Sequence, residues 1–451
     1  MSNDIRVRKG ADLNIKGKAE KIINKNIISE SYAIQPDDFF SLTPKLIVRE
    51  GDYVSKGSPI FFDKNNPNIQ FVSPVSGKIN QILRGSKRKI ESVIVKSDRK
   101  KEEIKHNIPL DSALNRKSII DLLTKSGSWP FIRQRPYNII ADPKINPKLI
   151  LISCFTSAPL DVDFDFLLKD NKEDFQKGVD ILSKLSDGDI VLTIDSNFGG
   201  FFQHISNAKI VSFNGPHPTA NPSVQIQKIS PINPGQKIWT VRPEDVVNIG
   251  RFFTTGIFSA QRTIAVAGNA LKKPQYFKST IGVQIGPMIK ITKLSIKTPV
   301  RYINGDVLSG SITSFDGHIG FYNNLVSVIP EGNNYRMFGW IPFVHNNIPS
   351  LSKTSLSWFF SKNGYDVNTN INGEERAMVV TGEMEKVFPL DIHPMQLLKV
   401  CMTGDIEKME AFGIYEVVPE DFGLIDYSNT SKIEAQKIIS NAIELMIKEV
   451  G

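Results

Sequence analysis

One segment of the chain places aromatic rings and arginines close enough together to hold a ligand. The segment SGSWPFIRQRPYNIIADP, residues 126–143, contains three aromatic residues and two arginines: Trp129, Phe131, Tyr137, Arg133 and Arg135. Aromatic faces stack on flat rings, and guanidinium groups donate hydrogen bonds to ligand oxygens. The segment could therefore bind an oxygen-bearing ring. The same side chains could instead pin the segment to the domain behind it, and we favour that structural interpretation.

A histidine, His217, lies in the proline-rich stretch GPHPTANP, residues 215–222. An imidazole exchanges protons near neutral pH, so His217 is a candidate proton donor to a bound ligand. The sequence reveals no carboxylate partner for it, and a loop histidine without one is more often structural or simply exposed. Both interpretations remain open.

The cysteines and histidines do not follow a metal-binding pattern. The chain has two cysteines, Cys154 and Cys401, which are too few for an iron–sulfur cluster or a cysteine zinc site. Its six histidines show neither H-x-x-x-H nor H-E-x-x-H spacing. The sequence therefore predicts that the chain binds no metal.

The excess positive charge belongs to the first quarter of the chain. Residues 1–110 hold 21 Lys and Arg against 13 Asp and Glu, which accounts for the whole net charge of +8. Four of these basic residues form one cluster: Arg84, Lys87, Arg88 and Lys89. The cluster is a candidate contact for anionic lipid or an acidic partner, or it is a solvated loop. No aromatic residues are interleaved with it, which argues against nucleic acid.

Residues 46–95 have the pattern of a small β-barrel. Short runs of alternating apolar residues are separated by turn dipeptides. The spacing G-D-x-V-x-x-G-x-x-I, followed by S-P-x-x-G-x-I, resembles the biotinyl/lipoyl hairpin fold. In carrier domains of that fold, a lysine at the hairpin tip carries the prosthetic group. Lys64 lies thirteen positions before Gly77 and precedes Asn-Asn-Pro, so we expect no covalent lipoyl or biotin there.

From residue 147, strands alternate with helices. The runs 149–155, 189–195 and 208–214 are typical of buried strands, and DFQKGVDILSKL and PEDVVNIGRFFTTG of helices. This order predicts a parallel sheet with helices over its faces. Ligand sites in such sheets lie beyond the carboxyl ends of the strands. Three predicted loops occupy that position: 156–159, 197–202 and 215–221.

The remaining residues combine a β module with a helical end. Short β runs between residues 258 and 330 suit a ubiquitin-like mixed sheet. Residues 331–375 contain aromatic residues such as Trp340 and Trp358, and we expect extended contact segments there. SKIEAQKIISNAIELMIKEV predicts a final helix with a capping box of Ser431 and Glu434. No stretch is apolar enough to cross a bilayer and no signal region opens the chain, so we expect a cytoplasmic protein.

Five motifs occur in a characteristic order: VRKGADLNIKG, NPNIQFVSPVSGKI, SGSWPFIRQRP, FNGPHP and INGEERAMVVTGEMEKVFPLDIHP. In kind and order they resemble the A subunits of the sodium-translocating NADH:quinone reductases. More distantly, the architecture is similar to the electron-input subunit of the Rnf complex and the flavin-carrying subunit of complex I. The pattern and the resemblance together imply four domains. They are a biotinyl/lipoyl-like hairpin domain (1–105), a Rossmann-like α/β domain without a flavin loop (106–257), a ubiquitin-like, SLBB-type module (258–330), and extended segments with a helical domain (331–451).

The resemblance also implies a function. It implies a peripheral subunit on the cytoplasmic face of a bacterial inner membrane, bound to membrane and flavin-carrying subunits. The complex would transfer electrons from NADH to a quinone such as ubiquinone and export Na⁺, with the isolated chain inactive. The distant relatives hold a flavin phosphate in a glycine-rich loop where this chain has SGSWPFIRQRP, and they carry an E-x-E-P turn and cysteine clusters that it lacks. We therefore expect no cofactor in this chain, with flavins and Fe–S centres in partner subunits.

Quinone is the ligand that the resemblance suggests for the aromatic segment and the histidine loop. The expected quinone contacts are Trp129, Phe131, Arg133, Arg135, Tyr137 and His217. The expected contacts with partners or membrane are Arg84, Lys87, Arg88 and Lys89. The alternative is a purely structural docking subunit of the same complex that never meets the quinone.

Overall fold

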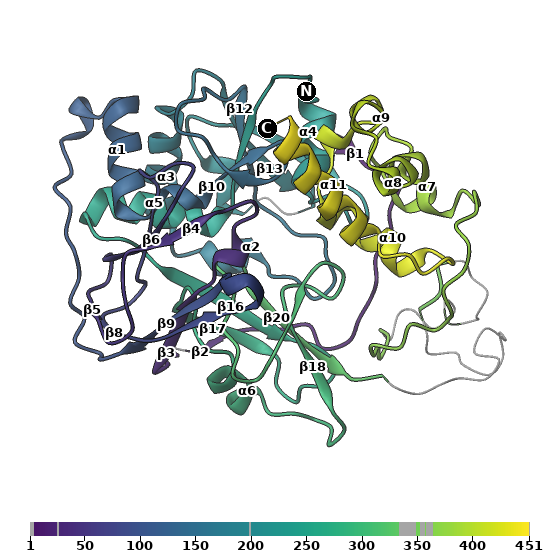
Figure 1. The fold of residues 1–451 in the computed structure, drawn as a ribbon, viewed down its shortest axis with the longest axis horizontal. Coiled ribbons are helices and arrows are strands. Elements are labelled where there is room, and N and C mark those ends of the chain that lie inside the picture. Colours follow the sequence, from purple (N-terminus) through teal and green to yellow (C-terminus); the bar gives the residue numbers. More distant parts are fainter. Residues whose placement is uncertain are drawn as a thin grey trace.

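Four parts of the chain pack around a shared core in the computed structural model (Figure 1). The structure describes residues 4–24, 27–197, 200–332, 349–351, 357 and 364–450. Trp340 and Trp358, which we expected in extended contact segments, lie outside the described residues. Within those residues, none of the helices combines the length and apolar composition that crossing a bilayer requires.

The N-terminal part is a pair of small antiparallel sheets, the hairpin domain. One sheet has the order β3 (Ser31–Ile34), β9 (Ile90–Ser97), β8 (Gly77–Arg84) and β5 (Tyr53–Val54); the other has β4 (Pro44–Leu46), β6 (Pro59–Asp63) and β7 (Gln70–Val72). The rings of Phe61 and Phe71, on the paired strands β6 and β7, stack with centroids 4.7 Å apart. Gly77 has φ +155°, and a Cβ there would lie 2.0 Å from the Lys96 carbonyl oxygen, so this turn requires glycine.

Helix α1 (Arg116–Ser126) connects the hairpin domain to the α/β sheet. The side chain of Asn115 caps its first turn by accepting a hydrogen bond from the Ser118 amide at 3.0 Å. The helix ends at Gly127, which adopts a left-handed conformation with φ +77°.

The central sheet has seven strands, and its elements match the predicted alternation. The order is β1 (Asp4–Arg6), β14 (Lys209–Asn214), β13 (Asp189–Asp195), β12 (Leu149–Ser153), β15 (Ile238–Val241), β10 (Ile132–Arg135) and β11 (Ile139–Ile140). The first five strands in this order run parallel, whereas β10 pairs antiparallel with both of its neighbours, β15 and β11. Because β12 is buried on both faces, nearly all of its residues are apolar.

Helices α3 (Lys172–Ser183) and α5 (Pro243–Thr255) pack against each other through glycines. A Cβ at Gly178 would lie 2.1 Å from the Val246 carbonyl oxygen, and one at Gly250 would lie 1.9 Å from that of Asp174. Only glycine allows this backbone approach. Two shorter helices, α2 (Phe164–Leu168) and α4 (Pro222–Ile229), complete this part.

The third part of the chain is built on a mixed sheet, which we call the third sheet and which has its own core. Its order is β19 (Ser311–Thr313), β18 (Val300–Asn304), β20 (Leu325–Pro330), β16 (Gln261–Ala267), β17 (Gln275–Thr280) and β2 (Glu20–Asn24). Helix α6 (Gly286–Thr292) lies against it, and Met288 packs in a cluster with Ile264, Phe277 and Val326. The first strand of this sheet in the sequence, β2, therefore comes from far upstream of the others.

The C-terminal part is helical, as predicted. Its helices are α7 (Glu383–Val387), α8 (Pro394–Thr403), α9 (Ile406–Ala411), α10 (Gly423–Ser428) and α11 (Ala435–Glu449). The predicted capping box of α11 is wrong, because the Ser431 hydroxyl donates to the Ala377 carbonyl at 3.1 Å. The carboxylate of Asp426 instead accepts from the amides of Ala435 and Gln436. A residue from the preceding helix thus supplies the cap.

Candidate functional site

A cleft of about 420 Å³ opens at the carboxyl ends of β12 and β15, where the four parts of the chain meet. We call it the central cleft. Its walls come from Phe40 and from the segments 133–138, 151–164, 217–222, 240–243, 304–311, 322–325 and 418–420. This volume is within the range of small-molecule sites. Two of the three predicted loops, 156–159 and 215–221, contribute to it, and the described residues of loop 197–202 do not.

One wall of the central cleft carries two arginines and a threonine. Arg133 stands directly opposite Thr240 in the antiparallel pairing of β10 with β15. Arg242 follows Thr240 by two positions in extended backbone, and such residues lie on the same face of a strand. All three line the cleft. We call them the Arg133–Thr240–Arg242 cluster.

The side chains of this cluster make no hydrogen bond to any residue that the structure describes. The Nε atoms of Arg133 and Arg242 and the Oγ1 atom of Thr240 are buried without a partner. Thr240 is only 3% exposed. The guanidinium carbon of Arg133 lies 4.7 Å from the centroid of the Tyr322 ring, a stacking contact that leaves its in-plane N–H groups free.

Charge around the cluster is only partly balanced. Burial lowers the pKa of the Arg242 guanidinium, the carboxylate of Asp161 opposes that shift, and the charge of Arg133 adds to it. Arginine nevertheless stays protonated in proteins. Burial in turn raises the pKa of Asp161 to about 6, despite the attraction of Arg242. The acid that faces the arginines therefore loses part of its charge just below neutral pH.

His217 lies in the same cleft and is 4% exposed. Its Nδ1 atom lies 3.1 Å from the Ser157 hydroxyl oxygen, and its backbone N–H donates to a carboxylate oxygen of Asp12 at 2.9 Å. Burial lowers the pKa of the imidazole, so the ring is neutral at pH 7. The side-chain partner of His217 is thus a hydroxyl group, which the sequence did not indicate.

Tyr137, another of the predicted contacts from the aromatic segment, also lines the cleft. Its ring centroid lies 5.9 Å from that of Tyr415. The Lys237 ammonium lies 5.9 Å from the same ring. Tyr137 therefore links the edge of the cleft to the C-terminal helices.

Trp129, Phe131 and Arg135 point away from the cleft. Trp129 is fully buried, and its indole N–H donates to the Ala141 carbonyl at 2.7 Å. Phe131 is 1% exposed and stacks with Phe321 at a centroid distance of 5.3 Å. Arg135 donates to Ser223 at 2.7 Å and pairs with Glu420 at 3.1 Å. The structure thus brings three of the six predicted contacts together and places the other three in the core.

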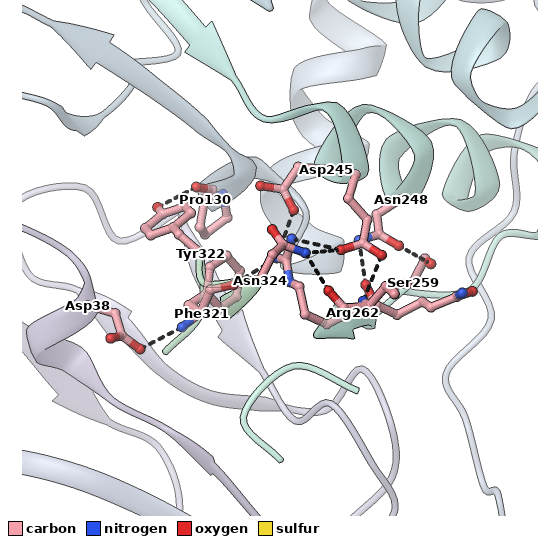
Figure 2. A network of polar contacts seen from close by, with 12 residues as sticks. Asp38, Pro130, Asp245, Asn248, Ser259, Arg262, Phe321, Tyr322 and Asn324 are labelled. Atoms are coloured by element: carbon pink, nitrogen blue, oxygen red, sulfur yellow. Dashed lines mark hydrogen bonds and ion pairs between the residues drawn. The ribbon is translucent and has the colours of Figure 1, made fainter. Parts of the chain in front are cut away.

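A buried polar network lies behind the cleft (Figure 2). Arg262, on β16, donates to the Phe321 carbonyl at 2.7 Å and pairs with Asp245 of α5 at 2.8 Å. The Asn324 amide group donates to Glu244 of the same helix, whose other oxygen accepts from the Thr263 amide at 2.8 Å. The network joins the α/β sheet to the third sheet. Burial raises the pKa values of both acids.

Three family domains match successive parts of the chain. They are the NqrA N-terminal barrel-sandwich hybrid domain at residues 5–98, the NqrA second alpha/beta domain at 114–258 and the NQRA C-terminal domain at 263–314. The NqrA protein of the Na(+)-translocating NADH-quinone reductase from Neisseria meningitidis serogroup B is 32% identical over 99% of this chain and 100% of its own length. Its counterpart from Haemophilus influenzae is 33% identical over the same shares.

The chain belongs to the NqrA family. The predicted resemblance is confirmed, and the barrel-sandwich match confirms the biotinyl/lipoyl-like prediction for the hairpin domain. Among solved structures, an H₂-reduced NAD⁺-reducing [NiFe]-hydrogenase is similar with a TM-score of 0.39 and 11% identity. That match covers 75% of this chain and 62% of the hydrogenase chain.

In this NqrA chain the four predicted contact residues lie at the exposed tip between β8 and β9. The tip includes the short 3₁₀ helix Ser86–Arg88, and Arg84, Lys87, Arg88 and Lys89 are all exposed. Lys89 pairs with Asp37 at 2.7 Å, and Arg84 donates to the Arg88 carbonyl at 3.2 Å. The side chains of Lys87 and Arg88 make no ion pair or hydrogen bond with the described residues. We call this surface the basic tip.

Metal ligation has no geometric support in the described residues of this NqrA chain. No group of three or more His, Cys, Asp or Glu side chains there could hold a metal ion. Both cysteines are free thiols, Cys154 being buried. Burial raises the pKa of each thiol, to about 12 for Cys401. Neither is therefore a reactive thiolate near neutral pH.

Proposed function

We propose that this chain is a peripheral subunit on the cytoplasmic face of a bacterial inner membrane, within a Na⁺-translocating NADH:quinone oxidoreductase. It supports electron transfer from NADH to quinone coupled to Na⁺ export. Membrane and flavin-carrying subunits of the same complex are its partners, and they hold the flavins and Fe–S centres. The observation that carries this proposal is the match to named NqrA proteins over their full length.

The four predicted domains, 1–105, 106–257, 258–330 and 331–451, are the units of this proposal. We assign the second to the Rossmann-like class because its parallel strands alternate with helices. We assign the third to the ubiquitin-like, SLBB-type class because helix α6 lies against a mixed sheet. Residues 4–24 add an edge strand to each of these two sheets.

The proposal includes no flavin in this chain. A flavin phosphate needs open backbone amides, which a glycine-rich loop provides. In the corresponding segment here, the Trp129 ring packs edge-on against Trp239 at 5.5 Å, and Phe131 stacks with Phe258 at 6.0 Å. These rings occupy the core at the position where such a loop would expose its backbone.

In this proposal a quinone head group binds in the central cleft. Tyr137 and Tyr322 offer aromatic faces, and Arg133 offers hydrogen-bond donors to a quinone carbonyl. The His217–Ser157 pair offers a path for the protons that quinone reduction consumes. The cleft volume of about 420 Å³ supports a ligand of this size.

Replacement of His217 tests the quinone contact. In the assembled complex, we expect His217→Gln to lower kcat/KM for a short-chain ubiquinone by about tenfold or more, because proton transfer by a positioned side chain typically contributes at least that much. NADH oxidation by an artificial electron acceptor should stay unchanged. The matched control is His204→Gln, since His204 is exposed and outside the cleft. Wild-type quinone kinetics in His217→Gln would remove the quinone contact from the proposal.

The second candidate function is a purely structural docking subunit of the same complex, without quinone contact. The burial of Trp129, Phe131 and Arg135 favours it, because these three expected contacts have partners inside the chain. The exposed basic tip favours it as well, because it offers a charged surface to a membrane partner or lipid. Both candidate functions keep the chain in the same complex.

A further inference from the structure

We propose that the Arg133–Thr240–Arg242 cluster binds a phosphate group, either free or carried by a nucleotide. This inference goes beyond the proposed electron-transfer role and does not depend on quinone contact. It rests on three polar side chains that line one wall of the central cleft and lack a partner in the described chain.

The arginines of the cluster are partly buried, with buried Nε atoms, and they differ from the two buried arginines among the described residues. Arg262 has the carboxylates of Glu244 and Asp245 within ion-pair distance, and Arg135 has that of Glu420. Arg133 and Arg242 have no ion pair or hydrogen bond among the described residues. Buried charges in proteins are normally paired, because removing an unpaired charge from water is costly. A bound anion would supply the missing partner to both.

Thr240 gives an independent indication of a ligand. Its hydroxyl is buried at 3% residue exposure, lines the cleft and has no hydrogen-bond partner. Buried hydroxyl groups are rarely left unpaired, because each loses its hydrogen bonds to water. A valine of the same shape would avoid that loss. Because this hydroxyl lies between the two arginines, all three side chains can donate hydrogen bonds to the same oxyanion.

The chemistry of the donors favours phosphate over other ligands. The two guanidinium forks are positively charged and only donate hydrogen bonds, which excludes a metal cation as the ligand of the cluster, and the hydroxyl can donate to the same ligand. A carboxylate has two oxygens and is satisfied by one fork, whereas the terminal oxygens of a phosphate can accept from both forks and the hydroxyl at once.

The surroundings of the cluster leave space for a nucleoside beside the phosphate. The Tyr322 ring already stacks on Arg133, and Phe155 and Phe164 line the same cleft. A volume of about 420 Å³ exceeds what a single phosphate occupies. Three acids line the cleft: Asp306 accepts hydrogen bonds from the Leu308 and Ser309 amides, and Glu420 pairs with Arg135. Asp161 attracts Arg242 without an ion pair, and its carboxylate accepts from the Val162 amide at 2.8 Å.

The test is a binding experiment with the full chain. Inorganic phosphate, AMP and adenosine are titrated by isothermal calorimetry and by thermal unfolding, with sodium chloride at matched ionic strength as the reference. We expect saturable heat and a rise in Tm with phosphate or AMP. Tighter binding of AMP than of phosphate would assign the phosphate to a nucleotide, and equal affinity would assign it to free phosphate. No saturable effect of either beyond that of chloride overturns the proposal.

Variants of the cluster decide whether binding occurs there. We expect Thr240→Val to weaken binding about tenfold through the loss of one charge-assisted hydrogen bond, and Thr240→Ser to bind like wild type. Thr240→Val removes an unpaired hydroxyl, so its fold should persist. Arg242→Gln should weaken binding about a hundredfold, whereas the exposed Arg84→Gln should not change it. Wild-type affinity in both Thr240→Val and Arg242→Gln would overturn the assignment.

Discussion

At the residue scale, Asp38 makes stability depend on pH. Its carboxylate accepts a hydrogen bond from the Phe321 amide at 2.8 Å, which joins the hairpin domain to the third sheet. Burial raises the pKa of Asp38 to about 7 from an ordinary value of 3.8, although this hydrogen bond lowers it. Between those two pH values the folded state holds a proton that the unfolded state has lost. The contribution of Asp38 to the free energy of unfolding is therefore complete below pH 3.8, where the carboxyl is protonated in both states. It is lost as the pH rises to about 7 and the buried carboxyl loses its proton.

The variant Asp38→Asn removes this proton equilibrium and keeps an oxygen that can accept from Phe321. We expect its free energy of unfolding, relative to wild type, to rise between pH 5 and pH 7 by roughly 1.4 kcal/mol per pH unit. Urea unfolding at pH 5, 6, 7 and 8 measures the difference. Asp121→Asn, on the exposed face of α1, is the control and should give a constant difference. A constant difference for Asp38→Asn would contradict this assignment.

Single residues were also where sequence reasoning reached its limit. The aromatic segment was predicted either to hold a ligand or to pin a loop. Arg133 and Tyr137 line the cleft, whereas Trp129, Phe131 and Arg135 are buried in the core. Alternation along β10 does not explain this division, because Arg133 and Arg135 lie on the same face of the strand. Arg135 is instead held by Ser223 and Glu420, which are remote in sequence. Thr240 and Arg242 were missed, although an arginine directly before the proline that starts a predicted helix was a usable signal. Tyr322 had no signal, because only the packing of the third sheet brings it to Arg133.

At the element scale, the junction of α5 with β16 depends on a buried ion-pair network. Arg262 is fully buried and carries the positive charge for both Glu244 and Asp245. Removing one partner of such a group leaves uncompensated charge in a low-dielectric interior. The network therefore fixes how the α/β sheet and the third sheet meet, because each charge needs the other element in place.

Replacing Arg262 by leucine tests this junction. We expect Arg262→Leu to lower the free energy of unfolding by about 3–5 kcal/mol, because two carboxylates lose their partner. Adding Glu244→Gln and Asp245→Asn to the same chain should recover part of that loss, since the buried charges are then gone. Chemical unfolding of the single and triple variants measures both effects. A triple variant less stable than Arg262→Leu would show that the acids contribute through other contacts.

Most elements were predictable from sequence because their determinants are local. Strands 189–195 and 209–214 and the helix that ends at Gly256 follow from periodicity and a glycine stop. The final helix was predicted, but its cap comes from Asp426, a contact that a local motif cannot reveal. The pairing of residues 4–6 with β14 was equally invisible, because partners about two hundred positions apart leave no periodic signal.

At the scale of the whole molecule, the net charge of +8 comes from one part of the sequence. The excess comes from residues 1–110, and the basic tip projects from that part between β8 and β9. Long-range attraction to an acidic partner or anionic membrane follows from such an asymmetry and is screened by salt. None of the four residues of the basic tip lines the central cleft, so the two surfaces can be varied separately.

Charge reversal at the basic tip tests the docking role. We expect the fourfold variant Arg84→Glu, Lys87→Glu, Arg88→Glu and Lys89→Glu to be released from membranes that carry the partner subunits, with its circular dichroism unchanged. Sedimentation of the membranes followed by immunodetection measures the released fraction. A variant in which each of these arginines is replaced by lysine and each lysine by arginine is the control, because it keeps the charge. Full membrane retention of the reversed variant would exclude the tip as a docking surface.

The first strands of the chain have partners that are synthesised much later. Strand β1 pairs with residues 212–214, and β2 pairs with β17 at residues 275–277. During translation these two segments must stay unpaired until more than two hundred further residues have left the ribosome. Closing such long loops slows folding and exposes unpaired strand edges in the meantime. The beginning of this chain is therefore the part most exposed to aggregation while it is being made.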